Sequence, residues 1–188
     1  MLLMAYRQGL FPMAVDDEGE IGWFSPDPRA IIPVDERFHI GHGLRRALKR
    51  GRFEIRFDAD FEGVMKACAT RHGKTWISKQ ILHSYRRLHE EGYAHSVEAW
   101  REGRLAGGLY GVRIGGAFFG ESMFHDETDA SKVALVALVT RMRERGFALL
   151  DTQWTTPHLR QFGAFEMPRA EYLDRLSRAI ELPCRLHP

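Results

Sequence analysis

The stretch FALLDTQWTTPHLRQFGA, residues 147–164, places an acid and an amide at the end of an apolar run. Residues 147–150 are typical of a sheet interior, and Asp151, Thr152 and Gln153 follow directly. Because side chains two positions apart on a strand point the same way, Asp151 and Gln153 should lie side by side. If the Gln153 NH2 group donates a hydrogen bond to Asp151, the Gln153 carbonyl oxygen becomes a better acceptor for the proton of an attacking amine. The structural alternative is that Asp151 caps the following helix and Gln153 lines the surface.

A carboxylate also interrupts the apolar stretch AFFGESMFH, residues 117–125. Burying Glu121 there without a partner would be costly, so we expect its side chain to face a cleft and to meet a cation. That cation is either an ammonium group of a substrate or a nearby arginine that forms a salt bridge. Strict alternation puts Phe119, Glu121 and Met123 on one face of the strand, whereas a bulge at Gly120 would bring Phe118 to that face instead.

Two further features favour contact with nucleic acid. Trp76, in GKTWIS, follows a basic turn where an exposed indole could stack on a base, although a core position fits the sequence equally well. The segment LRRALKRGR, residues 44–52, contains no acid, which favours phosphate binding over an ordinary solvated face. The candidate phosphate-binding residues are Arg45, Arg46, Lys49, Arg50 and Arg52.

The composition limits the possible classes of protein. A chain of 188 residues with 44% hydrophobic and 28% charged residues suits one globular domain, and its apolar runs are too short to cross a bilayer. Cys68 and Cys184 form neither a disulfide framework nor a zinc-binding spacing, so a reducing cytoplasm is the expected location. His83, His89 and His95 recur every six residues and share no helical face, so we expect no metal and no cofactor.

The predicted secondary structure changes near residue 94, where a series of three consecutive strands begins. Residues 10–34, with four prolines and an acidic turn, are expected to be largely loop. Helical spacing and caps such as Ser78 predict helices at residues 1–9, 40–51, 58–69, 78–92, 129–146, 156–163 and 168–180. Alternating or apolar runs predict strands at residues 52–58, 94–102, 104–114, 117–125, 147–152 and 164–167. Three antiparallel strands followed by a helix, a strand and a helix indicate an α+β or mixed-sheet domain.

This order of elements resembles the acyl-CoA N-acyltransferase (GNAT-like) fold, and several motifs narrow the resemblance. The motifs extend over essentially the whole chain and occur in the order found in bacterial leucyl/phenylalanyl-tRNA–protein transferases. They are LLMAYRQGLFP, WFSPDPRAIIP, TWISK, GESMFH, DASK and LLDTQ. The sequence is therefore similar to that family.

The resemblance implies a fold, an activity and partners. The fold would be α+β, with a GNAT-like mixed sheet and flanking helices at residues 94–188. A small, loop-rich α/β portion at residues 1–93 would precede it, without the family's usual N-terminal extension. The enzyme would be a cytoplasmic monomer without membrane contact. It would move Leu or Phe from aminoacyl-tRNA to the N-terminal Arg or Lys of acceptor proteins and so mark them for degradation.

The same resemblance assigns roles to residues. Asp151 and Gln153 would be the catalytic pair, and their replacement by alanine should reduce transfer severely while leaving aminoacyl-tRNA binding and thermal stability nearly intact. Trp76 would stack on the terminal adenine of the tRNA. Glu121 would bind either the α-ammonium of the aminoacyl group or the amino terminus of the acceptor. The substrate side chain would occupy an apolar pocket whose residues would otherwise be plain core, namely Phe118, Met123, Leu135, Leu138, Met142 and Leu150.

Two other functions share some of these features. A CoA-dependent acetyltransferase has the same fold, but its pyrophosphate-binding motif, R/Q-x-x-G-x-G/A, belongs between a strand and a helix. RERGFA, residues 143–148, fits the letters but runs from a helix into a strand. At the correct position, HDETDASK carries Asp126, Glu127 and Asp129, which would repel pyrophosphate. A non-catalytic tRNA-binding module is the second alternative.

Overall fold

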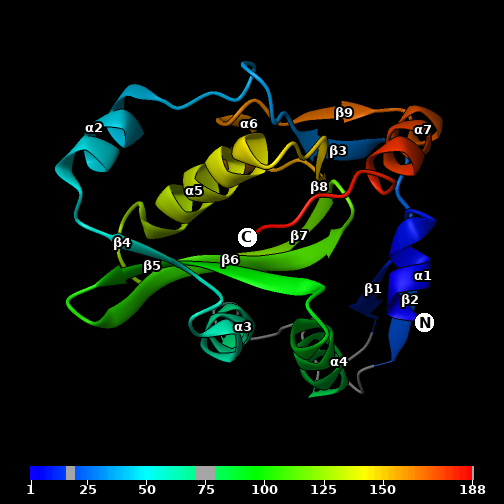
Figure 1. The fold of residues 1–188 in the computed structure, drawn as a ribbon, viewed down its shortest axis with the longest axis horizontal. Coiled ribbons are helices and arrows are strands. Elements are labelled where there is room, and N and C mark those ends of the chain that lie inside the picture. The colour runs from blue at the N-terminus through cyan, green and yellow to red at the C-terminus, as the bar shows by residue number, and fades with distance from the viewer. Residues whose placement is uncertain (16–19, 71–78, 188) are drawn as a thin grey trace.

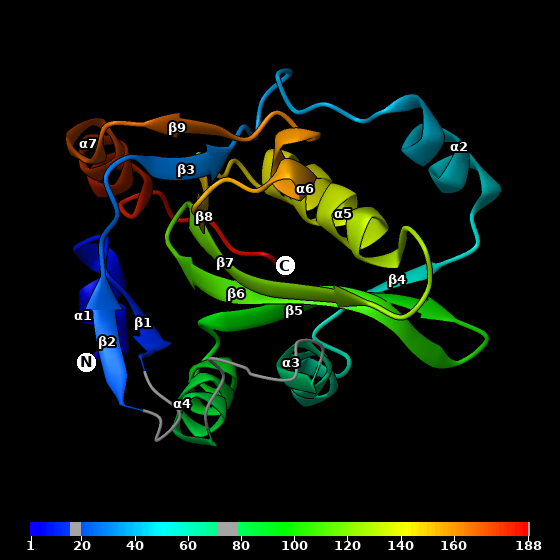
Figure 2. The same cartoon turned by 180° about the vertical axis from the view of Figure 1, so that it is seen from behind.

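A seven-stranded mixed sheet forms the centre of the protein (Figures 1 and 2). The computed structural model describes residues 1–15, 20–70 and 79–187. In their order across the sheet, the strands are β4 (Glu54–Phe57), β5 (Ala94–Arg101), β6 (Arg104–Ile114), β7 (Ala117–His125), β8 (Leu149–Gln153), β3 (Arg29–Ile32) and β9 (Phe165–Met167). Among the described strands, only β7 and β8 pair in parallel. The α+β fold with a mixed sheet that the sequence predicted is confirmed.

Two tight turns build the antiparallel part of this sheet. Glu102 and Gly103 both adopt a left-handed backbone, with φ of 50° and 74°, which suits the twist of the strands on either side. Gly115, with φ of 56°, turns the chain from β6 into β7, and a Cβ atom there would lie 2.2 Å from the carbonyl oxygen of Ile180. After β7, helix α5 (Ala130–Glu144) returns the chain so that β8 can pair with β7 in parallel.

The sheet separates two layers of apolar side chains, because neighbouring residues of a strand point to opposite faces. Phe118 and Leu150 belong to one apolar cluster, whereas Phe119 and Leu149 belong to the other. The first face is covered by α5, α2 (His42–Arg50) and α6 (Pro157–Arg160). The second face is covered by α3 (Phe61–Thr70), α4 (Lys79–Glu90), α1 (Leu2–Arg7) and α7 (Arg169–Ala179).

Residues 10–34 are not largely loop, so that prediction is wrong. They contain a hairpin of β1 (Phe11–Ala14) and β2 (Ile21–Phe24), followed by β3, which lies between β8 and β9. Strand β3 is buried along its whole length, and Pro28 and Pro33, which flank it, gave the segment the composition of a loop. Because β3 and β4 both come from residues 1–93, the central sheet draws strands from both of the expected portions of the chain.

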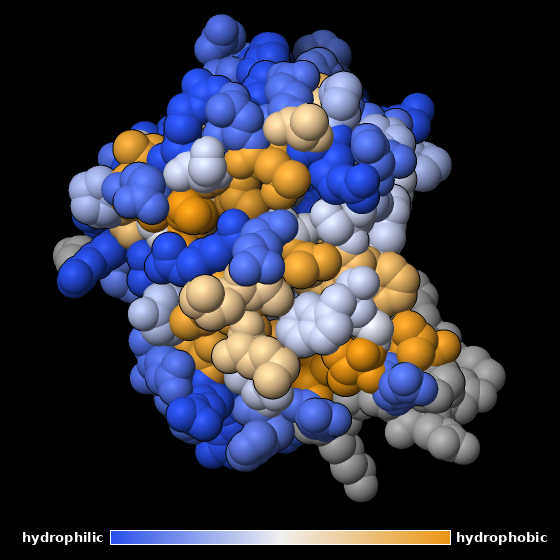
Figure 3. Space-filling model, turned by 90° about the vertical axis from the view of Figure 1, so that its right-hand side faces the viewer, coloured by the Kyte–Doolittle hydropathy of each residue, from blue (hydrophilic) through white to orange (hydrophobic). Residues whose placement is uncertain are grey.

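The other expected helices and strands are present, with bounds that differ by a few residues, and the Ser78 cap lies outside the described residues. On the side of the molecule that carries α1 and α7, hydrophobic residues are exposed between bands of hydrophilic ones (Figure 3). Among the described helices, none combines the length and apolar composition needed to cross a bilayer.

Candidate active site

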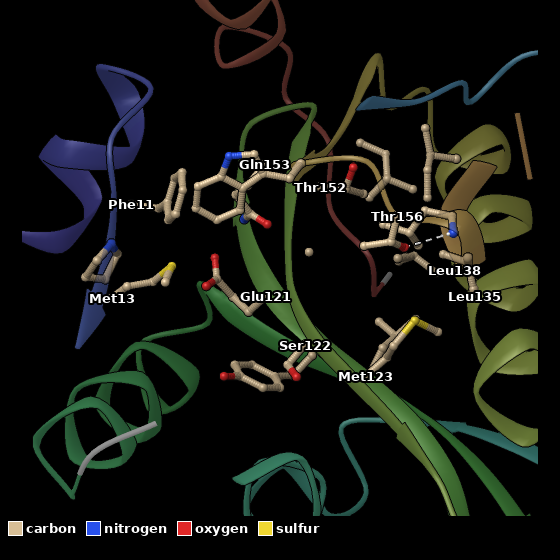
Figure 4. Close-up of a pocket in the computed structure, with 18 residues that line it drawn as sticks. Phe11, Met13, Glu121, Ser122, Met123, Leu135, Leu138, Thr152, Gln153 and Thr156 are labelled. Carbon is tan, nitrogen blue, oxygen red and sulfur yellow. Dashed lines mark hydrogen bonds between the residues drawn. The ribbon is translucent and has the colours of Figure 1, made fainter. Parts of the chain in front are cut away.

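A cavity of about 340 Å³ lies between β1, β7, the end of β8, α5 and α6. Phe11 and Met13 of β1 form one side of it, and Leu135 and Leu138 of α5 form the opposite side, with Glu121 between them (Figure 4). The cavity therefore has an apolar end against α5 and a polar end that contains the carboxylate.

Four of the six residues expected to form an apolar pocket line this cavity, namely Met123, Leu135, Leu138 and Leu150. The other two, Phe118 and Met142, do not line it and are fully buried in the apolar cluster behind it. Met142 lies one helical turn beyond Leu138, where α5 has passed the cavity. Both residues belong to the core instead: the apolar stripe of α5 extends beyond the cavity at Met142, and Phe118 precedes the residues of β7, 120–123, that border the cavity.

A bulge in β7 turns Glu121 toward the cavity. The pairing of β7 with β6 shifts by one residue between Tyr110 and Gly111, which leaves Glu121 without a partner residue on β6. The shift also brings Phe118 and Met123 into the same apolar cluster, although strict alternation would separate them. The bulge that the sequence offered as an alternative is therefore present.

Asp151 is completely buried in β8 and forms an ion pair with Arg29, which is equally buried at the start of β3. Arg29 donates from Nε to Oδ1 at 2.9 Å and from Nη2 to Oδ2 at 2.5 Å, and the Tyr172 hydroxyl donates to Oδ2 at 2.9 Å. Burial by itself would lower the pKa of the Arg29 guanidinium, but the bonds to Asp151 and its charge raise that pKa above the ordinary value. The Arg29 guanidinium is therefore charged.

Gln153 has a left-handed backbone, with φ of 61°, which is uncommon for a residue other than glycine. Its backbone N–H donates to Asp151 Oδ1 at 2.9 Å, so the carboxylate supports this conformation. The side-chain Nε2 is buried and has no hydrogen-bond partner among the described residues. The expected bond from the Gln153 amide to Asp151 is thus wrong, since the main chain makes it. The capping alternative is wrong too, because Thr156 caps the next helix through the Leu159 N–H.

Two tyrosines hold the carboxylate of Glu121. The Tyr6 hydroxyl donates to Oε1 at 2.6 Å, the Tyr85 hydroxyl donates to Oε2 at 3.2 Å, and the two hydroxyls also contact each other. Burial raises the pKa of Glu121 to about 7, because it outweighs these hydrogen bonds, which lower the pKa. Among the described residues Glu121 forms no salt bridge, so the alternative of a paired arginine is not found there, although the charge of the nearby Arg29 also lowers the pKa of Glu121.

The five cations of the predicted phosphate-binding segment are all exposed on or just after α2. Arg45 donates to the carbonyl oxygen of Ile40 at 2.8 Å, whereas Arg46, Lys49 and Arg50 form no ion pair with any described residue. In both ribbon views α2 lies beyond α5, at the opposite end of the molecule from β1 (Figures 1 and 2). Trp76 lies outside the described residues.

Sequence reasoning missed several residues that build this site. Arg29 could have been found from the sequence, because an arginine at the start of the buried run RAII requires a buried acid. No feature of the sequence points to Tyr6 and Tyr85, since they come from helices, lie 79 positions apart and meet only in the fold. Trp154 borders the cavity, is 43% exposed and packs edge-on against Phe11 with ring centroids 5.1 Å apart. Trp154 could have been identified as a site residue from its position directly after Gln153.

The mixed sheet with helices on both faces is consistent with an α+β acyltransferase fold. Comparison with known proteins narrows this class. The family model described as leucyl/phenylalanyl-tRNA protein transferase matches residues 31–177, and the model of its N-terminal domain matches residues 1–27. The chain belongs to the leucyl/phenylalanyl-tRNA–protein transferase family, whose members are aminoacyltransferases.

Curated relatives carry the same family name over nearly the whole chain. The leucyl/phenylalanyl-tRNA–protein transferase of Akkermansia muciniphila is 57% identical over 183 residues, which are 96% of this chain and 95% of that protein. The protein of the same name from Herpetosiphon aurantiacus is 56% identical over 181 residues, which are 96% of this chain and 93% of that protein. That of Gloeobacter violaceus is 54% identical over 98% of this chain and 95% of its own length.

Proposed function

We propose that this protein transfers Leu or Phe from aminoacyl-tRNA to the N-terminal Arg or Lys of acceptor proteins and thereby marks them for degradation. It would act in the cytoplasm as a monomer. The name shared by its relatives supports the donor and the type of acceptor. The choice of Arg or Lys rests on the resemblance of its motifs to those of the family.

The observation that carries this proposal is the two-ended cavity. Its apolar end, formed by Met123, Leu135, Leu138 and Leu150, suits a branched or aromatic side chain. Met123 is flexible and polarizable, so it can adapt to both Leu and Phe. At the other end, the Gln153 Nε2 atom is buried without a partner among the described residues, and such an atom costs about 1–3 kcal/mol unless a ligand satisfies it. An ester carbonyl oxygen is a suitable partner.

The reaction is the aminolysis of an ester. The amino nitrogen of the acceptor forms a bond with the ester carbonyl carbon, the bond from that carbon to the tRNA ribose oxygen breaks, and one amine proton ends on the ribose oxygen. In our proposal, the Gln153 amide lies beside the reacting carbon, where Oε1 accepts a hydrogen bond from the attacking amine and Nε2 donates one to the developing oxyanion. Holding both reactants in one geometry supplies much of the acceleration.

Asp151 has a positioning role in this proposal. Its carboxylate binds the backbone N–H of Gln153 and is itself fixed by Arg29 and Tyr172. These bonds hold Gln153 in its left-handed conformation, and that conformation aims the amide into the cavity. Asp151 therefore acts on the reaction through the Gln153 backbone.

Glu121 is proposed to bind the α-ammonium of the aminoacyl group. Glu121 and Met123 border the same cavity two residues apart, and in an aminoacyl ester the ammonium group and the side chain leave the same carbon. An ammonium group would also favour the ionised form of a carboxyl whose pKa burial raises to about 7. The exposed cations of α2 are proposed to hold acceptor-stem phosphates.

A CoA thioester fits this site poorly as a donor. RERGFA, residues 143–148, begins in the last two residues of α5 and ends just before β8, so no strand leads into the motif. Where β7 leads into α5, Glu127 pairs with Arg101 at 2.7 Å and Asp129 pairs with Lys132 at 3.0 Å. These acids occupy the helix N-terminus that would have to bind a pyrophosphate.

The proposed function is tested with the purified chain, radiolabelled Leu-tRNA and a peptide that begins with Arg. We expect the peptide to gain one Leu, and we expect no label on the same peptide when its amino terminus is acetylated. Acetyl-CoA should not serve as donor. Acetyl transfer would support the CoA-dependent alternative, and binding of tRNA without any transfer would support a non-catalytic module.

A further inference from the structure

Three side chains from distant parts of the chain meet outside the active-site cavity. Asp58 follows β4, His95 lies in β5, and His187 belongs to the segment that follows α7. One nitrogen or oxygen atom of each lies within 4.8 Å of the others, and none of the three residues lines the cavity. Asp58 lies 37 positions from His95 and 129 positions from His187, so histidine spacing along a helix does not reveal the cluster.

Asp58 has contacts on both oxygen atoms. Its Oδ2 lies 2.7 Å from His95 Nδ1 and 2.5 Å from His187 Nε2, and its Oδ1 accepts the backbone N–H of Ser96 at 2.7 Å. These contacts bring one carboxylate and two imidazole nitrogens together at one place.

The second nitrogen of His95 fixes the orientation of its ring. Nε2 lies 3.2 Å from the carbonyl oxygen of Gly92, to which it can only donate. Nδ1 is therefore the ring atom that faces Asp58, at 2.7 Å from Oδ2. A ring N–H that donates to a backbone carbonyl is also the usual outer contact of a metal-bound histidine.

We infer that Asp58, His95 and His187 bind a divalent transition metal ion of the Zn²⁺ class. Two imidazole nitrogens and one carboxylate oxygen are donors that zinc takes, and three protein ligands leave a fourth position for water. His187 is 43% exposed, so that position faces solvent. His89 does not supply its Nδ1 atom as a fourth ligand, because this atom donates to the carbonyl oxygen of Ala94 at 2.9 Å.

The metal fastens the segment after α7 to the edge of the sheet. Arg113 donates to the carbonyl oxygen of Cys184 at 2.9 Å, and Arg141 donates to that of Leu186 at 2.8 Å, so the chain already brings His187 to this position. The ligands Asp58 and His187 are 129 positions apart. Because unfolding separates them, the metal binds the folded state preferentially and stabilises it.

The test uses the full chain, freed of metal with a chelator and then given one equivalent or an excess of Zn²⁺, with Mg²⁺ as the comparison ion. We expect one bound zinc per chain and a rise in Tm of roughly 5–10 °C at a hundredfold excess over Kd, and no rise with Mg²⁺. His187→Ala should weaken zinc binding at least about tenfold and so reduce the Tm rise to about half or less. His39→Ala, at an exposed histidine outside the cluster, should retain both.

His187→Ala removes a partly exposed side chain, so the variant should fold. Its metal-free Tm is recorded separately, because a cluster held only by hydrogen bonds would lower that value as well. The inference is overturned if the wild type binds no zinc, or if His187→Ala binds zinc as tightly as His39→Ala. It is supported only by a zinc-dependent Tm rise that His187→Ala reduces and His39→Ala retains.

Discussion

At the residue scale, Asp151 is first of all the counter-ion of Arg29. Both side chains are fully buried, and removing one partner of a buried ion pair leaves an uncompensated charge that costs about 3–5 kcal/mol. Asp151→Ala should therefore lower the free energy of unfolding by about that amount, measured by urea denaturation. This replaces the sequence-based expectation that stability would be nearly intact.

The control is Asp174→Ala, which breaks an exposed pair with Arg178 and should change the denaturation midpoint little. Equal losses of stability in both variants would contradict the prediction for Asp151.

Glu121 should make stability depend on pH. Its pKa is raised to about 7 in the folded protein, so between its ordinary pKa and 7 the folded state binds more protons than the unfolded state. Stability should therefore fall as the pH rises from about 5 to 7 and level off above that range. Glu121→Gln cannot titrate and should remove this part of the slope. Urea denaturation at pH 5, 6, 7 and 8 measures it, and parallel curves for the two proteins would contradict the prediction.

At the scale of elements, α5 presents one stripe of apolar residues, of which only a part borders the cavity. Met123 of β7 and Met142 of α5 are a matched pair, because Met123 lines the cavity and Met142 is buried behind it. Met123→Ala should reduce transfer of Leu about tenfold more than transfer of Phe, since the larger ring fills the widened pocket. Met142→Ala should lower stability by about 2–5 kcal/mol and leave the Leu-to-Phe ratio unchanged. Equal losses for Leu and Phe in Met123→Ala would indicate general damage to the core.

Helix α2 presents cations that have no acidic partner among the described residues, and this distinguishes it from α4. Each phosphate contact releases counterions, so the logarithm of the tRNA association constant should fall linearly with the logarithm of salt concentration. Replacing Arg46 and Arg50 by Ala together should weaken tRNA binding and flatten that slope by about one to two units. Transfer from a minimal aminoacyl-adenosine donor, which has no stem, should be nearly unaffected.

The control for α2 is a double variant of exposed arginines that already pair with acids. Arg86 pairs with Glu90 and Arg87 with Glu91 on α4, so replacing both arginines changes the net charge equally. If the α2 variant keeps the wild-type salt slope, or if both variants flatten it to the same extent, α2 is an ordinary solvated face.

At the scale of the whole molecule, the sequence predicted what depends on local pattern. The antiparallel strands, the buried helix α5 and the strand that carries Asp151 follow from spacing and turn residues, and each is present. The contacts that complete the site could not be predicted this way, because Tyr6 reaches Glu121 over 115 positions and Arg29 reaches Asp151 over 122. Strand β3 was missed for the same reason, since a run of four residues between prolines becomes a strand only through its neighbours β8 and β9.

The central claim is that the Gln153 amide acts directly on the reacting ester. The measurement is the single-turnover rate of Leu transfer from Leu-tRNA to a peptide beginning with Arg, for wild type, Gln153→Ala and Gln153→Asn, with Gln161→Ala as the surface control. Asn tolerates the left-handed backbone of this position but withdraws the amide from the cavity.

We predict that both Gln153 variants lose roughly a hundredfold or more in rate, keep a Tm close to that of the wild type and still bind Leu-tRNA, whereas Gln161→Ala keeps the full rate. Wild-type rates in both Gln153 variants would contradict the claim.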